Sequence, residues 1–279
     1  MQAVILAGGL GTRLRPLTQK TPKVMVKIRG VEFLWYVVSW LTRNRIEDIV
    51  VCAGRRVEAI ASEGRSARKH LEPCDEVCDS TADACDAGFQ PAPSKILNPR
   101  LSAFVCRSSG VRLTFSVEDH PLGTAGAVRN ALGHLADEFI LINGDTFLPI
   151  EYETILAHWR KTKEAFDCLM LAYDNRENVA PNDTAIDSEG VVVAYSKRSP
   201  ARMQYVNAGL VVVKKSVFER FPPGVPLSLE EDVYLDLVRR RKMAALVTPE
   251  RYYDIGTPER LRTFEQYVDR RPEIVPRKT

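Results

Sequence analysis

The chain has 279 residues and a mass of 31.3 kDa, enough for one large domain or two small ones. Hydrophobic residues at 45% and charged residues at 27% exclude fibrous and disordered proteins. The 39 basic and 36 acidic side chains leave a formal net charge of +3, too small to predict a nucleic-acid or membrane partner. No apolar run approaches the ~18 residues that a membrane-spanning helix needs.

The N-terminus and the cysteines together predict a cytoplasmic location. Residues 1–7 are apolar, but no basic region precedes them and glycines and Arg13 follow, unlike a secretory signal. The six cysteines of a chain without an export signal are expected to be reduced thiols rather than a disulfide framework. Two of them, Cys52 and Cys168, fall within apolar strands and are predicted to be core residues.

Strand and helix patterns alternate through the first 172 residues. The predicted strands are residues 2–7, 49–53, 111–118, 139–143 and 168–172, and the predicted helices are residues 31–45, 124–135 and 152–163. Residues 8–23, rich in glycine and proline, form a loop after the first strand. Strands that alternate with helices pair in parallel through right-handed crossovers, so this order predicts a layered α/β sheet.

The pattern changes after about residue 174. Residues 191–193, 206–213 and 243–247 predict strands, and residues 230–241 predict a helix. A last helix is expected to begin at Thr257, because threonine caps helices and Pro258 suits the first turn. We expect one domain over residues 1–279, with a cysteine- and acid-rich insertion at 64–106 and a tail at 269–279.

The strongest motif is the loop after the first strand. Its residues are Leu6, Ala7, Gly8, Gly9, Leu10, Gly11, Thr12, Arg13 and Leu14. Glycines at the end of a strand allow backbone N–H groups to approach an anion closely. Leu14 replaces the third glycine of the dinucleotide fingerprint, and Pro16 stands where that motif needs a helix. A P-loop is excluded as well, since no Gly-Lys-Ser/Thr run follows.

Fixed cations follow these glycines, first Arg13 and then Lys23. This arrangement suits a triphosphate, because negative charge grows on the departing pyrophosphate during attack at the α-phosphorus. The alternative is a tight turn carrying two solvated basic side chains.

The string from Leu6 to Lys23 closely resembles the signature of the nucleotidyltransferases that make nucleotide-activated sugars from sugar 1-phosphates. The resemblance recurs, in the family's order, at residues 118–126, 143–145, 207–209 and 253–256. It implies a Rossmann-like, mostly parallel α/β sheet with helices on both faces. It also implies a nucleotide-binding half over residues 1–145 and a sugar-phosphate half over residues 146–268.

Two aspartates are the candidate magnesium ligands. Asp145 follows an apolar strand, so its carboxylate is expected at the carboxyl edge of the sheet, where ligands of open α/β sheets bind. Mg²⁺ takes one or two carboxylates together with phosphate oxygens and water, and Asp254 is the obvious second ligand. A lone aspartate after a strand is more often a turn or cap residue, but the resemblance points to the same two positions.

The resemblance implies that Glu118 faces the nucleobase, with Pro121, Gly123 and Thr124 in the same nucleotide site. A carboxylate accepts hydrogen bonds only, so it suits the N1–H and N2–H₂ donors of guanine. It would also accept from the N3–H of uracil. An exposed acid at the end of a strand is the alternative interpretation.

The resemblance also assigns Lys197 to the sugar-linked phosphate and Asn207 to a sugar hydroxyl, with Glu230 completing that pocket. Ser196 departs from the family, which has an acid before this lysine, so Arg198 is an alternative to Lys197. Acids such as Glu230 that open a helix are more often caps than ligands.

The substrates implied are a nucleoside triphosphate and a sugar 1-phosphate, and the motifs at residues 121–126 most resemble guanylyltransferases for heptose or mannose 1-phosphate. A uridylyltransferase for an amino-sugar or glucose phosphate is the alternative. A non-catalytic nucleotide-sugar sensor or regulatory subunit is an alternative of another class. The presence of Arg13, Lys23, Asp145 and Asp254 disfavours it, because a non-catalytic relative has no chemical need for all four. A homo-oligomer is left open.

The insertion holds a candidate structural zinc site. Its ligands would be His70, Cys74, Cys78 and Cys85. Pro73 interrupts any helix between them, and the spacing is not that of a standard zinc finger. An acidic loop with reduced thiols, or a cap on a neighbouring subunit, is the alternative interpretation.

Overall fold

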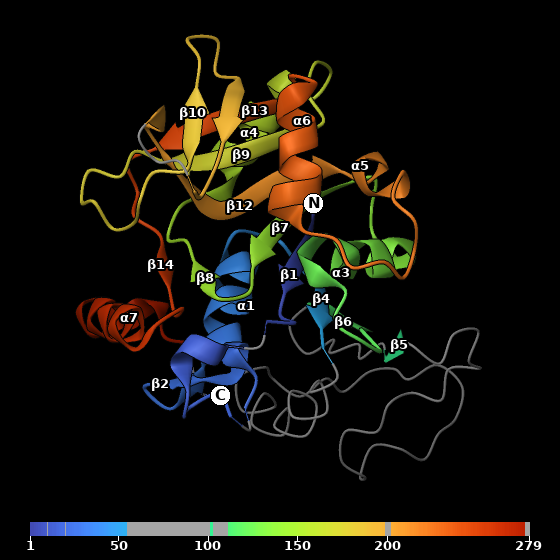
Figure 1. Ribbon diagram of the computed structural model, residues 1–279. Helices are drawn as coiled ribbons and strands as arrows, with labels where there is room; N and C mark the ends of the chain where they lie inside the picture. Colours follow the sequence, from blue (N-terminus) through green and yellow to red (C-terminus); the bar gives the residue numbers. More distant parts are fainter. Residues whose placement is uncertain (10, 20, 55–100, 103–110, 199–201, 277–279) are drawn as a thin grey trace.

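The computed structural model describes residues 1–9, 11–19, 21–54, 101–102, 111–198 and 202–276. Its centre is an eight-stranded sheet with the order β13-β9-β12-β7-β1-β4-β6-β5, which runs from the top of Figure 1 to its lower right. The strands are β1 (Gln2–Leu6), β4 (Asp48–Ala53), β5 (Leu101–Ser102), β6 (Arg112–Val117), β7 (Glu138–Asn143), β9 (Cys168–Tyr173), β12 (Val206–Lys214) and β13 (Met243–Thr248).

Six of these strands run in one direction. β1 pairs in parallel with β4 and β7, β4 with β6, and β13 with β9. Only β12 and the short β5 run against their neighbours. β12 is reversed because the chain reaches it from β9 through a hairpin, β10 (Thr184–Ile186) and β11 (Val192–Tyr195), rather than through a crossover helix. The predicted mostly parallel sheet is therefore confirmed.

Helices cover both faces of the sheet (Figure 1). Side chains alternate along β1, so that Ala3 and Ile5 enter one apolar cluster and Val4 enters the other. The first cluster is completed by α1 (Phe33–Arg43), α4 (Tyr152–Thr162) and α7 (Pro258–Arg270). The second is completed by α3 (Gly123–Ala131), α5 (Ser216–Glu219) and α6 (Leu235–Arg239).

In the described part of the chain, two small sheets accompany the large one in addition to the β10–β11 hairpin. β8 (Thr146–Phe147), just after β7, pairs antiparallel with β14 (Tyr253–Asp254), so that Asp254 lies opposite Thr146. This pairing holds the segment that contains Asp254 at the carboxyl edge of the central sheet. The other small sheet pairs β2 (Lys27–Ile28) with β3 (Val31–Glu32).

Three predicted helices differ from the structure. The helix expected at 31–45 begins at Phe33, because Val31–Glu32 pairs with Lys27–Ile28 as a strand. The helix expected at 124–135 is α3, which ends at Ala131 and is followed by a 3-10 turn over Leu132–His134. The helix expected at 230–241 is a π-helical turn, η5 (Leu229–Tyr234), followed by α6. Ser228 caps this turn by accepting a hydrogen bond from the Glu231 N–H at 3.2 Å.

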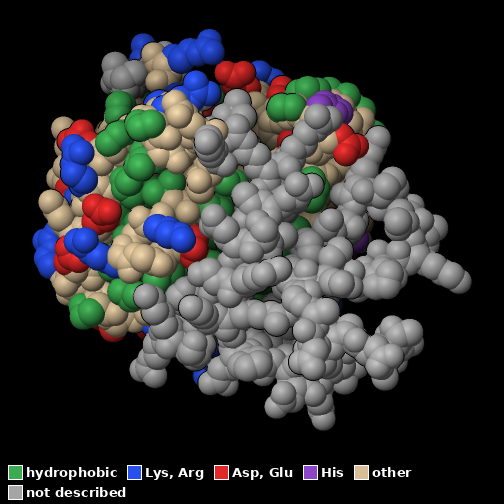
Figure 2. Space-filling model, turned by 90° about the horizontal axis from the view of Figure 1, so that it is seen from below, with side chains coloured by type: hydrophobic (Ala, Val, Ile, Leu, Met, Phe, Trp, Pro, Cys, Tyr) green, Lys and Arg blue, Asp and Glu red, His purple; other side chains and the backbone are tan. Residues whose placement is uncertain are grey.

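The surface that the structure describes carries both signs of charge. On the coloured part of the face seen in Figure 2, basic and acidic side chains lie next to one another. Exposed ion pairs among the described residues include Arg112 with Asp48 at 3.1 Å. Among the described residues, no helix is both long enough and apolar enough to cross a bilayer. Cys52 and Cys168 are buried in strands with free thiols, as predicted.

Candidate active site

The glycine loop folds back so that Gly11 lies against Thr18 and Lys23. Gly11 has φ +61°, and a Cβ there would lie 3.0 Å from Thr18 Cγ2 and 3.2 Å from Lys23 Cβ. The Thr18 hydroxyl donates to the Gly11 carbonyl at 2.6 Å, which fixes this turn. Only glycine fits both the backbone conformation and the close approach. As a result, Arg13 and Lys23, ten positions apart in sequence, lie at the same end of the loop.

The predicted cations and acids converge at Gly256. A Cβ on Gly256 would lie 2.7 Å from Asp254 Oδ1 and 3.7 Å from both Arg13 Nη2 and Lys23 Nζ. Lys23 is 9% exposed and forms an ion pair with Asp145. A larger residue at position 256 would therefore displace the groups that the sequence assigned to phosphate and metal binding.

Asp145, in the turn between β7 and β8, is held next to β14, which contains Asp254. The Asp145 carbonyl accepts from the Ile255 N–H at 3.0 Å. The Asp254 carboxylate accepts from the Gly256 N–H at 2.8 Å and from Arg260 Nη1 at 3.0 Å. The structure thus brings both aspartates to one edge of the sheet, and each is matched with a cation of the chain. Two carboxylates beside a glycine-rich loop are a donor set that fits Mg²⁺.

Glu118 joins the glycine loop to the segment that follows β6. Its Oε2 accepts from the Leu122 N–H at 2.9 Å, and a Cβ on Gly8 would lie 3.1 Å from its Oε1. Glu118 is 6% exposed, and burial raises the pKa of its carboxyl group. The alternative of an exposed acid is therefore wrong. Gly8 and Gly9 are exposed beside it, which leaves their backbone open to a ligand.

The motif at residues 121–126 docks on a segment that the sequence did not single out. Gly123 has φ +70°, and a Cβ there would lie 2.5 Å from the Leu227 carbonyl oxygen. The Leu227 N–H donates to the Leu122 carbonyl at 2.8 Å, and Thr124 Oγ1 accepts from the Leu229 N–H at 2.8 Å. Close backbone contact therefore requires glycine at 123, and the Thr124 hydroxyl caps the turn that carries Glu230. Pro121 is exposed at the start of this motif.

At the other end of the site, Lys197 and Glu230 form an ion pair. Asn207 lies in β12, and its N–H donates to Asp183 Oδ1 at 2.8 Å. Asp183 is 5% exposed, and burial raises the pKa of its carboxyl group. The structure thus adds Asp183, which no motif marked in the sequence, to the three predicted sugar-phosphate residues. Arg198, the alternative to Lys197, instead pairs with Glu231 at 3.3 Å.

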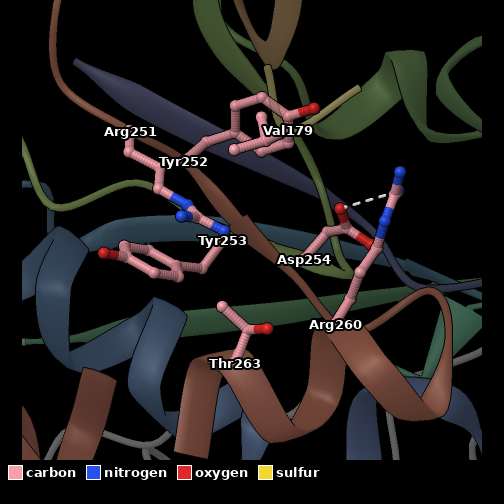
Figure 3. Close-up of a pocket in the computed structure, with 7 residues that line it drawn as sticks. All are labelled: Val179, Arg251, Tyr252, Tyr253, Asp254, Arg260 and Thr263. Atoms are coloured by element: carbon pink, nitrogen blue, oxygen red, sulfur yellow. Dashed lines mark hydrogen bonds and ion pairs between the residues drawn. The ribbon is translucent and has the colours of Figure 1, made fainter. Parts of the chain in front are cut away.

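A pocket with about 270 Å³ of empty volume opens beside Asp254 (Figure 3). It is lined by Val179, Arg251, Tyr252, Tyr253, Asp254, Arg260 and Thr263. The Arg251 guanidinium lies over the Tyr253 ring, 5.2 Å from its centroid. Burial raises the pKa of Tyr252 to about 12, and the carboxylates of Asp254 and Asp183 act in the same direction. Tyr252 is therefore influenced by the charges of both Asp254 and Asp183.

The candidate zinc ligands His70, Cys74, Cys78 and Cys85 lie outside the described residues. Within the described ranges, no group of three or more histidine, cysteine, aspartate or glutamate side chains could hold a metal ion. The zinc site gains no support from the structure.

Comparisons with known proteins identify the family of the chain. The family model named Nucleotidyl transferase matches residues 2–270, and the chain belongs to this family. A D-glycero-alpha-D-manno-heptose 1-phosphate guanylyltransferase of Campylobacter jejuni is 25% identical over 93% of this chain and 96% of its own length. A mannose-1-phosphate guanylyltransferase of Mycobacterium tuberculosis is 26% identical over 93% of this chain, which spans 62% of that relative.

A solved structure shows the same fold. The crystal structure of HddC from Yersinia pseudotuberculosis complexed with GMP-PN superposes with a TM-score of 0.67 at 24% identity, covering 95% of this chain and 98% of the other. The predicted family and fold class are therefore confirmed.

Proposed function

We propose that this nucleotidyltransferase transfers a guanylyl group from GTP to a heptose or mannose 1-phosphate and releases pyrophosphate. The observation that carries the proposal is the convergence of Arg13, Lys23 and Asp254 at Gly256, with Asp145 paired to Lys23. The names of the relatives support the guanine base and the heptose- or mannose-type acceptor.

The nucleotide occupies the first half of the site in this proposal. The glycine-loop residues Leu6, Ala7, Gly8, Gly9, Gly11 and Thr12 hold the triphosphate through their backbone. Glu118 is proposed to meet the base, with Pro121, Gly123 and Thr124 forming the adjoining wall. Of these, Gly123 and Thr124 act through the contacts that they make with residues 227–229.

The acceptor occupies the second half, with Lys197 on its phosphate and Asn207 and Glu230 on the sugar. Its phosphate oxygen attacks the α-phosphorus in line, so no covalent enzyme intermediate is needed. Arg13 and Lys23 then stabilise the charge that develops on the leaving pyrophosphate.

Asp145 and Asp254 would hold a magnesium ion. When bound, such an ion neutralises charge on phosphate oxygens and orients them. Lys23, paired with Asp145, and Arg260, paired with Asp254, keep the two carboxylates in fixed positions.

A substrate screen tests the proposal. Four nucleoside triphosphates are combined with heptose, mannose, glucose and N-acetylglucosamine 1-phosphates, with pyrophosphate release as the readout. We expect the highest kcat/KM with GTP and a heptose or mannose 1-phosphate. Preference for UTP would replace the guanylyl proposal with the uridylyl alternative, and binding without pyrophosphate release would indicate a sensor.

Asp145→Asn supplies the matching site variant for this screen. We expect it to lower kcat by about 10²–10³-fold, the size of effect seen when one preorganised electrostatic contact is removed. Asp174→Asn is the control, because Asp174 pairs with Arg176, a largely exposed side chain, and takes no part in the cluster at Gly256. Equal activity of the two variants would contradict the role of Asp145.

A further inference from the structure

The hydroxyl group of Tyr195 is buried without a hydrogen bond. Tyr195 ends β11 and is 6% exposed, and its ring packs edge-on against Tyr234 with centroids 5.5 Å apart. No described residue meets the distance and angle of a hydrogen bond with the Tyr195 hydroxyl, although the side chains of Asn207 and Glu230 lie near it. A buried hydroxyl without a partner destabilises a folded protein, and phenylalanine would fill the same space without this penalty. The packing therefore explains the ring of Tyr195 but not its oxygen atom.

The Asp183 carboxylate, just before the strand paired with that of Tyr195, also has an oxygen atom without a hydrogen bond from the described residues. The register of the β10–β11 hairpin sets Tyr195 opposite Thr184, the residue after Asp183. Asp183 Oδ1 accepts from the Asn207 N–H and from the Thr184 hydroxyl, both at 2.8 Å. Asp183 Oδ2 receives no hydrogen bond from the described part of the chain. One carboxylate oxygen of Asp183 thus remains available as an acceptor.

The charges near Tyr195 keep its hydroxyl protonated. Burial raises the pKa of the Tyr195 hydroxyl, and the nearby carboxylates of Asp183 and Glu230 raise it further. A protonated phenol is a hydrogen-bond donor, whereas an ionised carboxylate only accepts. The Tyr195 donor and the Asp183 acceptor therefore belong to the same group of polar side chains as the Lys197–Glu230 ion pair.

We propose that the Tyr195 hydroxyl and Asp183 Oδ2 bind one hydroxyl group of the sugar, which makes both residues determinants of acceptor specificity. This inference rests on the proposed function, because it assumes that the sugar 1-phosphate binds beside Lys197 and Asn207. A sugar hydroxyl can donate to Asp183 and accept from Tyr195 at the same time. A deoxy sugar can do neither, and an O-methylated sugar cannot donate.

Tyr195→Phe tests the inference directly. We expect the KM for the acceptor to rise about 3- to 10-fold, the value of one neutral hydrogen bond, while the KM for the nucleotide stays unchanged. The melting temperature should not fall, because the variant loses no hydrogen bond within the protein. An unchanged acceptor KM would overturn the inference.

Tyr36→Phe is the matched control. Tyr36 is fully buried, and its hydroxyl donates to the Ile28 carbonyl at 2.8 Å. This variant should lower the melting temperature and leave the acceptor KM unchanged. A fall in stability for Tyr195→Phe as large as that for Tyr36→Phe would show that the Tyr195 hydroxyl is structural, and would overturn the inference.

Monodeoxy analogues of the acceptor separate specific recognition from general damage. One deoxy position should raise the KM of the wild-type enzyme but not raise it further in Tyr195→Phe, because the same hydrogen bond is already lost. Asp183→Asn, which removes the acceptor oxygen with little change in shape, should be selective for the same deoxy position. Additive effects at every position would contradict the inference.

The two proposals fail in different ways. A wild-type enzyme that releases no pyrophosphate with any substrate pair overturns the proposed function and this inference with it. An active wild-type enzyme with unaffected Tyr195→Phe and Asp183→Asn variants overturns only the inference.

Discussion

The two ends of the site differ in how their polar groups are partnered. At the phosphate end, Lys23 pairs with Asp145 and Arg260 pairs with Asp254, and these groups crowd against Gly256. At the sugar end, the Tyr195 hydroxyl has no partner among the described residues. The end proposed for the phosphates is thus held by ion pairs within the chain. The end proposed for the sugar contains the Lys197–Glu230 ion pair as well, but it leaves the Tyr195 hydroxyl unpaired within the described part of the chain.

This difference matches what each end is proposed to bind. Every nucleoside triphosphate presents the same phosphates, so fixed charges can be set in place before the substrate arrives. A sugar is distinguished by the positions of its hydroxyl groups, and a site that matches them must hold unpaired polar groups until the sugar binds. Specificity at the sugar end therefore costs stability in the free protein.

Arg13→Ala is the prediction with the largest effect, because it removes a charge from the fixed end. We expect kcat to fall by about 10²–10³-fold with the melting temperature unchanged, since Arg13 is exposed and its loss leaves the core intact. Pyrophosphate release and thermal unfolding measure the two effects. Arg15→Ala, an exposed arginine in the same loop, should retain activity. Unchanged turnover in Arg13→Ala would remove the assignment of that residue.

Gly123→Ala tests the connection between the two ends. With φ +70° and a Cβ 2.5 Å from the Leu227 carbonyl, alanine should cost about 1–3 kcal/mol of unfolding free energy. Because residues 227–229 lead to Glu230, the KM values for both substrates should rise. Gly133→Ala is the control, since a Cβ there meets no atom within 4 Å. Equal denaturant midpoints for the two variants would contradict this account of Gly123.

The smallest predicted effect is a pH dependence of GTP binding. Burial raises the pKa of Glu118, so its carboxylate becomes protonated at a pH above the ordinary glutamate range. The KM for GTP should rise a few-fold as the pH falls through that raised pKa, because a protonated carboxyl is a poorer acceptor for the base. The stability contribution has the opposite sign: the raised pKa favours folding at low pH and is lost as the pH rises.

Glu118→Gln is the comparison that isolates this effect. The amide oxygen can still accept from the Leu122 N–H, but the side chain does not titrate in this range. The acidic rise in KM for GTP should therefore be absent in the variant. An identical pH profile in both enzymes would assign the rise to the nucleotide itself.

Much of the fold and the phosphate end could be predicted from sequence. The glycines of the loop, Arg13 and Lys23 lie close together in the chain, and an apolar run marked the strand that precedes them. Asp145 could be placed at the carboxyl edge because it follows the apolar strand ending at Asn143. Local patterns of this kind determine local structure.

The sugar end could be predicted only in part, because its partners come from distant segments. Asp183 lies in a connection without a motif, and Tyr195 differs from other strand tyrosines only in what surrounds its hydroxyl. The reversed strand β12 and the π-helical turn at Leu229–Tyr234 likewise depend on tertiary contacts. Gly123 was assigned to the nucleotide by resemblance, whereas its backbone contact with Leu227 appears only in three dimensions.

The contact between residues 122–125 and Leu227 has a consequence for redesign. The same short stretch braces the wall proposed for the base and continues into the turn that carries Glu230. Substitutions selected there to admit a new acceptor would also alter the choice of donor. Libraries that aim to change one substrate alone should spare residues 225–229 and vary the β10–β11 hairpin instead.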